Sequence, residues 1–186
     1  MKEYLRLVFA LKDFQLSLFR GNIFKELVKA LFEKSEYLAI PYGYENPYSN
    51  VKKRLPKNLE DCSQTVLRIR TSPDLLIFDN ESGDVKLVEV KMSSYETPQV
   101  KRIELYKKYW NDAIIVFVVP YGNVFYAQEI DKLGIKPFYD LKSDLNSIQT
   151  IFPRFRSVDF SEYQHLACHL IQALKTNGTE AKENSD

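Results

Sequence analysis

Cysteine, net charge and long apolar runs are all scarce in this sequence, and each shortage excludes a class of protein. Only two cysteines occur among the 186 residues. Cys62 and Cys168 lie far apart without CxxC spacing, which excludes a disulfide framework and a zinc knuckle. No segment approaches the roughly 20 apolar residues of a membrane span, and the first residues lack the apolar run of a signal peptide. We therefore expect a soluble protein of the reducing cytoplasm.

The formal net charge is only +1, so bulk attraction does not indicate a nucleic-acid-binding module. Any affinity for nucleic acid must come from local basic clusters. The candidate clusters are Lys52, Lys53, Arg54 and Lys57; Arg68 and Arg70; and Lys101, Arg102, Lys107 and Lys108. Taken alone, such clusters are more often solvated charged faces than binding sites.

What is abundant is apolar and aromatic sequence, spread along the whole chain. A hydrophobic content of 45% in 186 residues allows one sizeable core, and the length favours one domain over two. We expect this domain to span residues 1–176, with its core at about 21–130. The polar residues 177–186 are predicted to form a disordered tail.

Hydrophobic periodicity predicts a mixed α/β domain. Gly21-Asn22 is interpreted as a break between two N-terminal helices. The face of the second helix is assigned to Ile23, Leu27, Ala30 and Leu31, with Glu26 at its border. The expected helices are 3–19, a second from about 23, 97–110 and 161–175. The expected strands are 37–44, 66–70, 74–78, 85–91, 113–119 and 124–130, with a long exposed loop at 45–64 and a turn at 80–83.

Two of these strands form a hairpin whose register follows from its turn. If the turn pairs Asp79 with Asp84, the constant sum of antiparallel partners places Asp74 directly opposite Glu89. Opposed residues share a face, with Cβ atoms roughly 4.5–5.5 Å apart. Lys91 lies on the same face because it is two residues from Glu89. Two acids and an amine are therefore expected at one end of the hairpin.

Both faces of this hairpin are otherwise apolar, so we expect it in the middle of a covered sheet. Two unpaired carboxylates in such a setting repel each other, and burial strengthens the repulsion. A divalent cation cancels it, and two carboxylates with several waters suit Mg²⁺, with Mn²⁺ as a substitute. The alternative is a structural ion pair of Lys91 with Glu89 or Asp74.

Pro73-Asp74, followed by Glu89-Val90-Lys91, resembles the signature of the PD-(D/E)xK nuclease superfamily. That superfamily includes restriction endonucleases, archaeal-type Holliday junction resolvases and RecB-like nucleases. Its core order is helix, three antiparallel strands, helix, strand, and the expected order agrees over about residues 21–119. The resemblance thus implies a restriction endonuclease-like core, a central mixed β-sheet flanked by helices (α-β-β-β-α-β), with an extra helix at each terminus.

The resemblance also implies roles for individual residues. Asp74 and Glu89 match the metal-binding acids, and the carbonyl of Val90 would be a further ligand. Lys91 matches the lysine that orients or activates the attacking water. Glu26 matches the acid that many members carry on the first helix, where it binds metal directly or through water.

Some of these assignments have rivals. Glu33, Glu36 and Glu45 compete with Glu26 for the role of the helix acid, and Asp79 and Asp84 are weaker alternatives to Asp74. Gln99 and Tyr106 resemble the Gln and Tyr that RecB-like members place on the helix after the ExK motif. The competing interpretation of that pair is an ordinary exposed Gln and a core Tyr.

The expected activity is Mg²⁺-dependent hydrolysis of phosphodiester bonds in DNA, with products that carry 5′-phosphate and 3′-hydroxyl ends, as the resemblance implies. Phosphate contacts are expected from Lys52, Lys53 and Arg54 in the loop, and from Lys101 and Arg102 on the following helix. The alternative is a non-catalytic nucleic-acid-binding or assembly module on the same fold. A homodimer is compatible with either. The sequence leaves the substrate's structure open.

Overall fold

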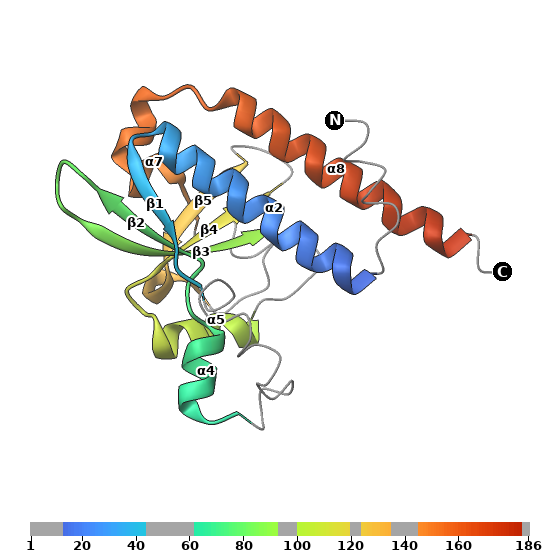
Figure 1. Ribbon diagram of the computed structural model, residues 1–186, viewed down its shortest axis with the longest axis horizontal. Helices are drawn as coiled ribbons and strands as arrows, with labels where there is room; N and C mark the ends of the chain where they lie inside the picture. Colours follow the sequence, from blue (N-terminus) through green and yellow to red (C-terminus); the bar gives the residue numbers. More distant parts are fainter. Residues whose placement is uncertain (1–12, 44–61, 93–99, 120–123, 135–144, 184–186) are drawn as a thin grey trace.

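The computed structural model describes residues 13–43, 62–92, 100–119, 124–134 and 145–183. In the helix that begins at residue 13, side chains are described from residue 21 onward. In the helix that begins at residue 100 they are described from residue 103 onward, and in the last helix up to residue 173. The described chain forms a mixed α/β arrangement around a single six-stranded sheet (Figure 1).

Helices precede, interrupt and follow the strands of this sheet. The strands are β1 (Tyr37–Pro41), β2 (Leu75–Asp79), β3 (Val85–Met92), β4 (Ile114–Val118), β5 (Phe125–Glu129) and β6 (Asn146–Ser147). The α-helices are α2 (Asp13–Lys34), α4 (Gln64–Arg70), α5 (Val100–Tyr109), α7 (Ile148–Ile151) and α8 (Ser161–Glu183), and the 3-10 helices are η1 (Ile130–Lys132) and η2 (Pro153–Ser157).

The strands lie in the order β1-β2-β3-β4-β5-β6, so every strand pairs with its neighbour in sequence. All pairs are antiparallel except β3 with β4, which run parallel. A parallel pair needs a crossover connection, and α5 lies within it. The predicted strands 37–44, 74–78, 85–91, 113–119 and 124–130 are confirmed within one to three residues at their ends.

Two hydrophobic clusters lie on opposite faces of the sheet. The larger joins α2, α7, η2 and α8 to one face, where Phe24, Val28 and Leu31 of α2 pack with alternate residues of β2, β3 and β4. The smaller lies beneath α5, where Ile103 and Tyr106 pack against Ile115 and Phe117 of β4. All five residues of β4 are buried, since this strand is covered on both faces.

Alternation along β3 assigns its side chains to these two clusters. Val88 and Val90 belong to the cluster beneath α2, whereas Leu87 packs with the cluster beneath α5. Glu89 and Lys91 have the parity of Leu87, so the charged residues of β3 face α5. Glu89 and Lys91 therefore lie on the face of β3 opposite the one that α2 covers.

Two predictions for the N-terminal half of the chain were wrong. Gly21-Asn22 does not break the first helix, because α2 runs through it without interruption. A single helical glycine costs only about 1 kcal/mol, and the burial of Phe24 and Val28 offsets this. Residues 66–70 are helix α4 and not a strand; the Ser63 hydroxyl caps this helix by accepting from the Val66 N–H at 3.3 Å.

The C-terminal part contains elements that the sequence did not indicate. The segment that holds the short strand β6, helix α7 and 3-10 helix η2 brings two buried phenylalanines and an isoleucine under α2: Phe152, Phe155 and Ile148. Helix α8 begins at the predicted residue but continues to Glu183, past the boundary predicted at 176. It lies alongside α2 in Figure 1.

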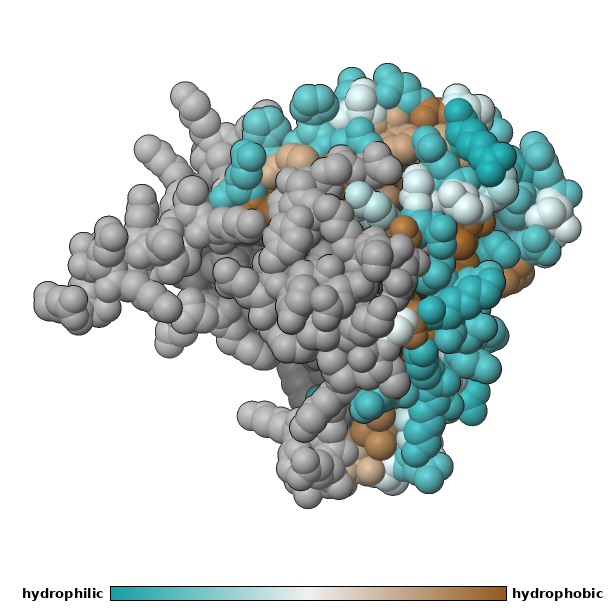
Figure 2. All heavy atoms as spheres, turned by 180° about the vertical axis from the view of Figure 1, so that it is seen from behind, coloured by the Kyte–Doolittle hydropathy of each residue, from teal (hydrophilic) through white to brown (hydrophobic). Residues whose placement is uncertain are grey.

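The described surface is mixed in polarity. On the face shown in Figure 2, hydrophilic residues cover most of the described surface, and hydrophobic residues show as patches between them. The exposed large apolar residues include Leu38 and Ile40 of β1 and Val85 of β3. Among the described helices, none combines the length and apolar character needed to cross a membrane.

Candidate functional site

The predicted register of the β2–β3 hairpin is confirmed. Leu75 pairs with Val88 and Phe78 with Val85. Continued by one residue beyond Leu75, this register places Asp74 opposite Glu89. Asp74 lies just before β2, so its side chain is at the end of the strand and less constrained by the pleat than one in the middle.

Every polar atom of the Asp74 carboxyl and carbonyl groups has a partner. Oδ2 accepts from the Val90 N–H at 2.9 Å, and Oδ1 is 2.7 Å from the Lys25 ammonium. The backbone carbonyl accepts from the N–H groups of Tyr42 and Gly43, at 2.9 and 3.2 Å. Asp74 thereby joins the ends of β1, β2 and β3 to helix α2, with 9% of its side chain exposed.

Gly43 packs closely against this acid. A Cβ atom at this position would lie 3.3 Å from the Pro73 carbonyl oxygen and 3.7 Å from Oδ1 of Asp74. Any larger residue would push on the carboxylate or on the backbone that carries it. Glycine therefore suits the close approach of two chain segments here.

Glu89 is the most deeply buried charged group of the site, with 4% of its side chain exposed. Its Oε1 atom accepts from both the Lys91 ammonium and the Tyr106 hydroxyl. Burial raises the pKa of Glu89 to about 7, and the Lys91 ammonium opposes this shift while the Asp74 carboxylate adds to it. Glu89 therefore changes its charge near neutral pH in the metal-free protein.

Lys91 and Tyr106 lie beside Glu89 on the face of the sheet that α5 covers. The Lys91 ammonium lies 5.4 Å from the centre of the Tyr106 ring, in addition to its ion pair with Glu89. Tyr106 reaches this position because it lies one helical turn from Ile103, which anchors α5 on β4. Of the pair Gln99 and Tyr106, the tyrosine contacts the predicted site; Gln99 lies outside the described residues.

The side chain of α2 that contacts Asp74 is Lys25 and not the predicted Glu26. Glu26 is exposed. The buried stripe of α2 runs through Phe24, Leu27, Val28, Leu31 and Phe32. The buried face predicted from the sequence began one residue too early, at the half-buried Ile23. In the structure the residue at the edge of the buried face is therefore Lys25 and not Glu26.

The rivals of Glu26 lie away from this cluster or outside the described chain. Glu33 is exposed and pairs with Lys29 at 3.5 Å. Glu36 lies 3.6 Å from Arg154. Glu45 is outside the described residues.

The predicted phosphate-binding clusters are described only in part. Lys52, Lys53 and Arg54 lie outside the described residues, as do the side chains of Lys101 and Arg102. In the second cluster, the Arg68 guanidinium stacks over the Trp110 ring, 5.2 Å from its centre. In the third, the Lys107 ammonium donates to the Asp131 carbonyl at 3.3 Å, and Lys108 lies over Tyr109.

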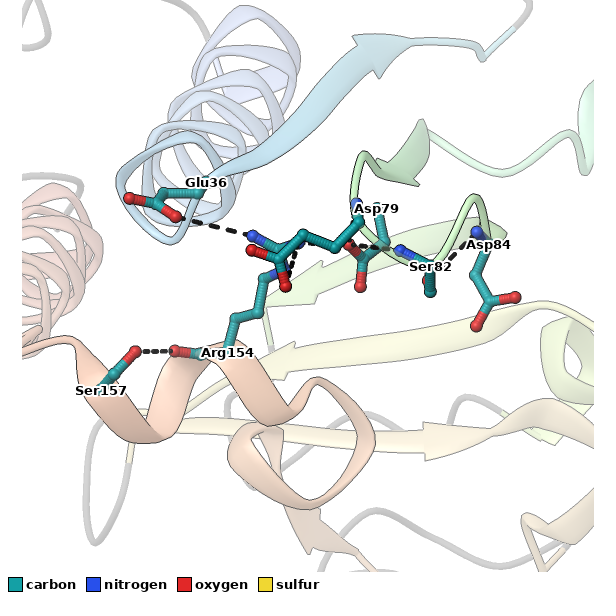
Figure 3. Close-up of polar contacts among 7 residues, drawn as sticks. Glu36, Asp79, Ser82, Asp84, Arg154 and Ser157 are labelled. Carbon is teal, nitrogen blue, oxygen red and sulfur yellow. Dashed lines mark hydrogen bonds and ion pairs between the residues drawn. The ribbon is translucent and has the colours of Figure 1, made fainter.

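The turn end of the hairpin carries the second acidic pair, Asp79 and Asp84 (Figure 3). Asp79 Oδ1 accepts from the Glu81 N–H at 3.0 Å and lies 2.6 Å from the Arg154 guanidinium. The Asp84 carbonyl accepts from the Asp79 N–H at 2.8 Å, and the Asp84 N–H donates to the Ser82 hydroxyl at 3.2 Å. Asp79 is therefore a turn and ion-pair residue, as expected of a hairpin end.

The Asp74 end of the hairpin offers a divalent cation only a small number of protein ligands. Among the described residues, no group of three or more His, Cys, Asp or Glu side chains is arranged to hold a metal ion. Two carboxylates are present, and the described contacts of Glu89 all fall on Oε1. Its other oxygen can serve a cation, and Mg²⁺ commonly takes one or two protein carboxylates and completes its shell with water.

Scans of protein-family models, curated proteins and solved structures find no match to this chain. The site must therefore be interpreted from its own geometry. Its core is Asp74, Glu89 and Lys91, joined by Tyr106, which the sequence had offered as a candidate. The structure adds Lys25 and Gly43. A corrected helix face would have found Lys25, but no sequence signal pointed to Gly43.

Proposed function

We propose that this chain is a metal-dependent nuclease that hydrolyses phosphodiester bonds in DNA, and that Asp74, Glu89 and Lys91 form its active site. One observation carries the proposal: the hairpin register brings Asp74 opposite Glu89, whose carboxylate accepts from the Lys91 ammonium. Burial first, and the Asp74 carboxylate after it, raise the pKa of Glu89, and a divalent cation bound beside these acids would favour their charged forms.

The element order supports the same proposal. From α2 to β4 the chain follows helix, three antiparallel strands, crossover helix and a parallel strand, with α4 inserted between the first two strands. This is the order that the resemblance to PD-(D/E)xK nucleases implies, with the acid at the start of the second strand and the ExK motif on the third. We accordingly propose a restriction endonuclease-like core.

Each residue of the site would have a separate role in the reaction. Asp74 and Glu89 would hold Mg²⁺, together with the Val90 carbonyl, and the bound ion would polarise the phosphoryl oxygen and acidify a water. Lys91 would stabilise the negative charge that develops as the water attacks, an effect that a dry site strengthens. Tyr106 would orient Glu89 through its hydroxyl group.

The test is cleavage of DNA with Mg²⁺ or Mn²⁺, compared between the wild-type chain and the variants Asp74→Ala and Lys91→Ala. We expect cleavage by the wild type and none by either variant, although both retain their circular dichroism spectra. Cleavage that survives in both folded variants, or that proceeds equally in EDTA, would refute the proposal.

One observation favours a second candidate, a non-catalytic nucleic-acid-binding or assembly module. Each carboxylate already has an ammonium partner, Lys25 for Asp74 and Lys91 for Glu89. Such pairs are what a structural polar cluster would show without any metal. Binding of DNA without cleavage in either metal would favour this candidate, and absence of both DNA binding and metal uptake would leave a structural role.

A further inference from the structure

We infer that the proposed nuclease acts on DNA that carries unpaired bases, and that a base of the substrate stacks on the ring of Tyr42. This inference rests on the proposed function and names its substrate class. The juxtaposition behind it is an exposed tyrosine, a tryptophan and an arginine beside the proposed active site. The ring centres of Tyr42 and Trp110 are 6.4 Å apart, and the Arg68 guanidinium lies 5.2 Å from the centre of the Trp110 ring.

Tyr42 is exposed and yet held in place. The residue is 39% exposed, and its backbone N–H donates to the Asp74 carbonyl at 2.9 Å. Its ring meets Trp110 edge to face, at an interplanar angle of 84°. An aromatic side chain that is fixed at both its backbone and its ring loses little entropy when a ligand binds. The ring next to the proposed metal-binding acid is therefore preorganised for a flat ligand.

Trp110 supports this ring and is itself fixed. It follows the last residue of α5 and packs against the cluster beneath that helix. Its indole N–H donates to the Thr71 hydroxyl at 3.3 Å, and Arg68 of helix α4 stacks over its ring. Trp110 has these neighbours and is less exposed than Tyr42, so Tyr42 presents the more accessible ring surface of the two.

Tyr42 lies on the side of the sheet that carries Glu89 and Lys91. In β1 every second residue is buried beneath α2, and Tyr42 has the parity of the exposed residues between them, such as Leu38. The contact with Trp110, which packs with the cluster beneath α5, agrees with this parity. A nucleotide stacked on Tyr42 would therefore lie on the side where the proposed chemistry takes place.

An exposed aromatic ring favours unpaired bases over a duplex. In a duplex each base is covered by its neighbours on both faces, whereas an unpaired base offers a face to the protein. Stacking on an aromatic side chain depends little on base identity, because every base has a π face. The net charge of +1 gives little long-range attraction for the phosphates of a duplex. Arg68 is exposed and adds a cation for a phosphate of the stacked nucleotide.

The experiment uses the full chain, in which Trp110 is the only tryptophan. Its fluorescence therefore reports directly on a base that reaches the Tyr42–Trp110 pair. Affinity for a short oligothymidylate, and for the same strand in a duplex, is measured independently by the anisotropy of a label on the DNA. Both measurements are made in EDTA and in Ca²⁺, so that binding is scored apart from Mg²⁺-dependent cleavage.

The variants separate stacking from simple packing. Tyr42→Leu keeps apolar bulk without an aromatic face, and Tyr42→Phe keeps the face. The matched control is Leu38→Ala, because Leu38 is 46% exposed on the same side of the adjoining strand β1.

We expect the wild type to bind the single strand more tightly than the duplex, with quenching of the Trp110 fluorescence. Tyr42→Leu should lower the affinity for the single strand about tenfold. It should leave the salt dependence unchanged, since no phosphate contact is lost. Tyr42→Phe and Leu38→Ala should bind as the wild type does.

Three outcomes would overturn the inference: an affinity that Tyr42→Leu leaves unchanged, a duplex bound as tightly as the single strand, or binding without any change in Trp110 fluorescence. Failure of the proposed function has a different signature, in which the single strand binds with the expected dependence on Tyr42 but is not cleaved in Mg²⁺ or Mn²⁺. Conversely, cleavage of a duplex at equal rates by the wild type and Tyr42→Leu would leave the nuclease and remove the stacking site. If Tyr42→Leu loses its thermal unfolding transition, Tyr42→Met takes its place under the same expectations.

Discussion

The two ends of the β2–β3 hairpin carry the same kind of acidic pair in different environments. At the turn end, Asp79 lies opposite Asp84; at the other end, Asp74 lies opposite Glu89. Asp79 is partly exposed and pairs with Arg154 (Figure 3). Glu89 is almost wholly buried and shares one oxygen between an amine and a phenol.

The pKa values of Asp79 and Glu89 differ because the balance between desolvation and hydrogen bonding differs at the two ends. Desolvation acts on both acids in the same direction. At Asp79 it is outweighed by hydrogen bonds from Glu81 N, Arg154 and Ser82 N, which lower the pKa of Asp79 below its usual range. At Glu89 desolvation prevails over Lys91 and Tyr106, and the pKa rises to about 7. A carboxylate whose charged form is disfavoured by its surroundings is the better candidate for a catalytic role.

The largest difference in activity is expected between two variants that each remove one negative charge, at opposite ends of the hairpin. Asp74→Asn keeps an oxygen for the Val90 N–H but loses the charge. We expect it to lower the rate of DNA cleavage in Mn²⁺ by a factor of about 10²–10³ or more. Asp79→Asn should cleave at the wild-type rate. Equal losses in the two variants, measured on the same substrate, would mean that the ends are not functionally distinct.

The second prediction concerns pH and stability in EDTA. The folded pKa of Glu89 is raised, so the protonated form stabilises the fold below pH 4.5, and this contribution is lost as pH rises through about 7. Each pKa unit corresponds to about 1.4 kcal/mol. Between these pH values, the free energy of unfolding of Glu89→Gln should therefore gain about 3 kcal/mol relative to wild type.

This gain is measured by urea unfolding at several pH values. Asp79→Asn is the control, and its difference from wild type should stay constant between pH 4.5 and 7. The lowered pKa of Asp79 contributes stability that is complete above its unfolded value of 3.8 and is lost only on further acidification. A difference between Glu89→Gln and wild type that stays constant across this range would show that Glu89 has an ordinary pKa.

A smaller effect is expected from the hydroxyl group that holds Glu89. Tyr106→Phe keeps the ring beneath Lys91 but removes the hydrogen bond to Oε1, and cleavage should fall by about tenfold. The matched control on the same helix is Tyr109→Phe, because the Tyr109 hydroxyl is buried without a hydrogen-bond partner in the described structure. This control should cleave normally, and an equal loss in both variants would point to a general effect on α5.

The smallest effect on activity is expected at the turn end. Arg154 lies 2.6 Å from Asp79 and 3.0 Å from Glu81, and it stacks over the Tyr37 ring. Arg154→Met should lower Tm by a few degrees and leave cleavage unchanged, since it loosens the turn and not the site. Arg156→Met, exposed on the same 3-10 helix, is the control for calorimetry. A loss of cleavage in Arg154→Met would show that the two ends are coupled.

Much of the site could be predicted because it depends on local rules. The turn before Val85 and the constant sum of antiparallel partners are enough to place Asp74 opposite Glu89. Lys25 could not be found in the same way, since α2 is apolar on more than one side and its orientation depends on what it packs against. The expected strand at 66–70 was wrong because a capped short helix with no buried residue leaves only a weak pattern.

The five longer strands, the turn and the parity of β3 follow from the amino-acid sequence alone, since strand alternation and turn chemistry act over a few neighbouring residues. Only the tertiary structure decided which side of α2 faces the sheet, and hence that Lys25 meets Asp74. It also decided that Glu89 lies dry beneath Tyr106, because burial is a property of all the elements packed together. The pKa of Glu89, on which the proposed chemistry depends, follows from that packing.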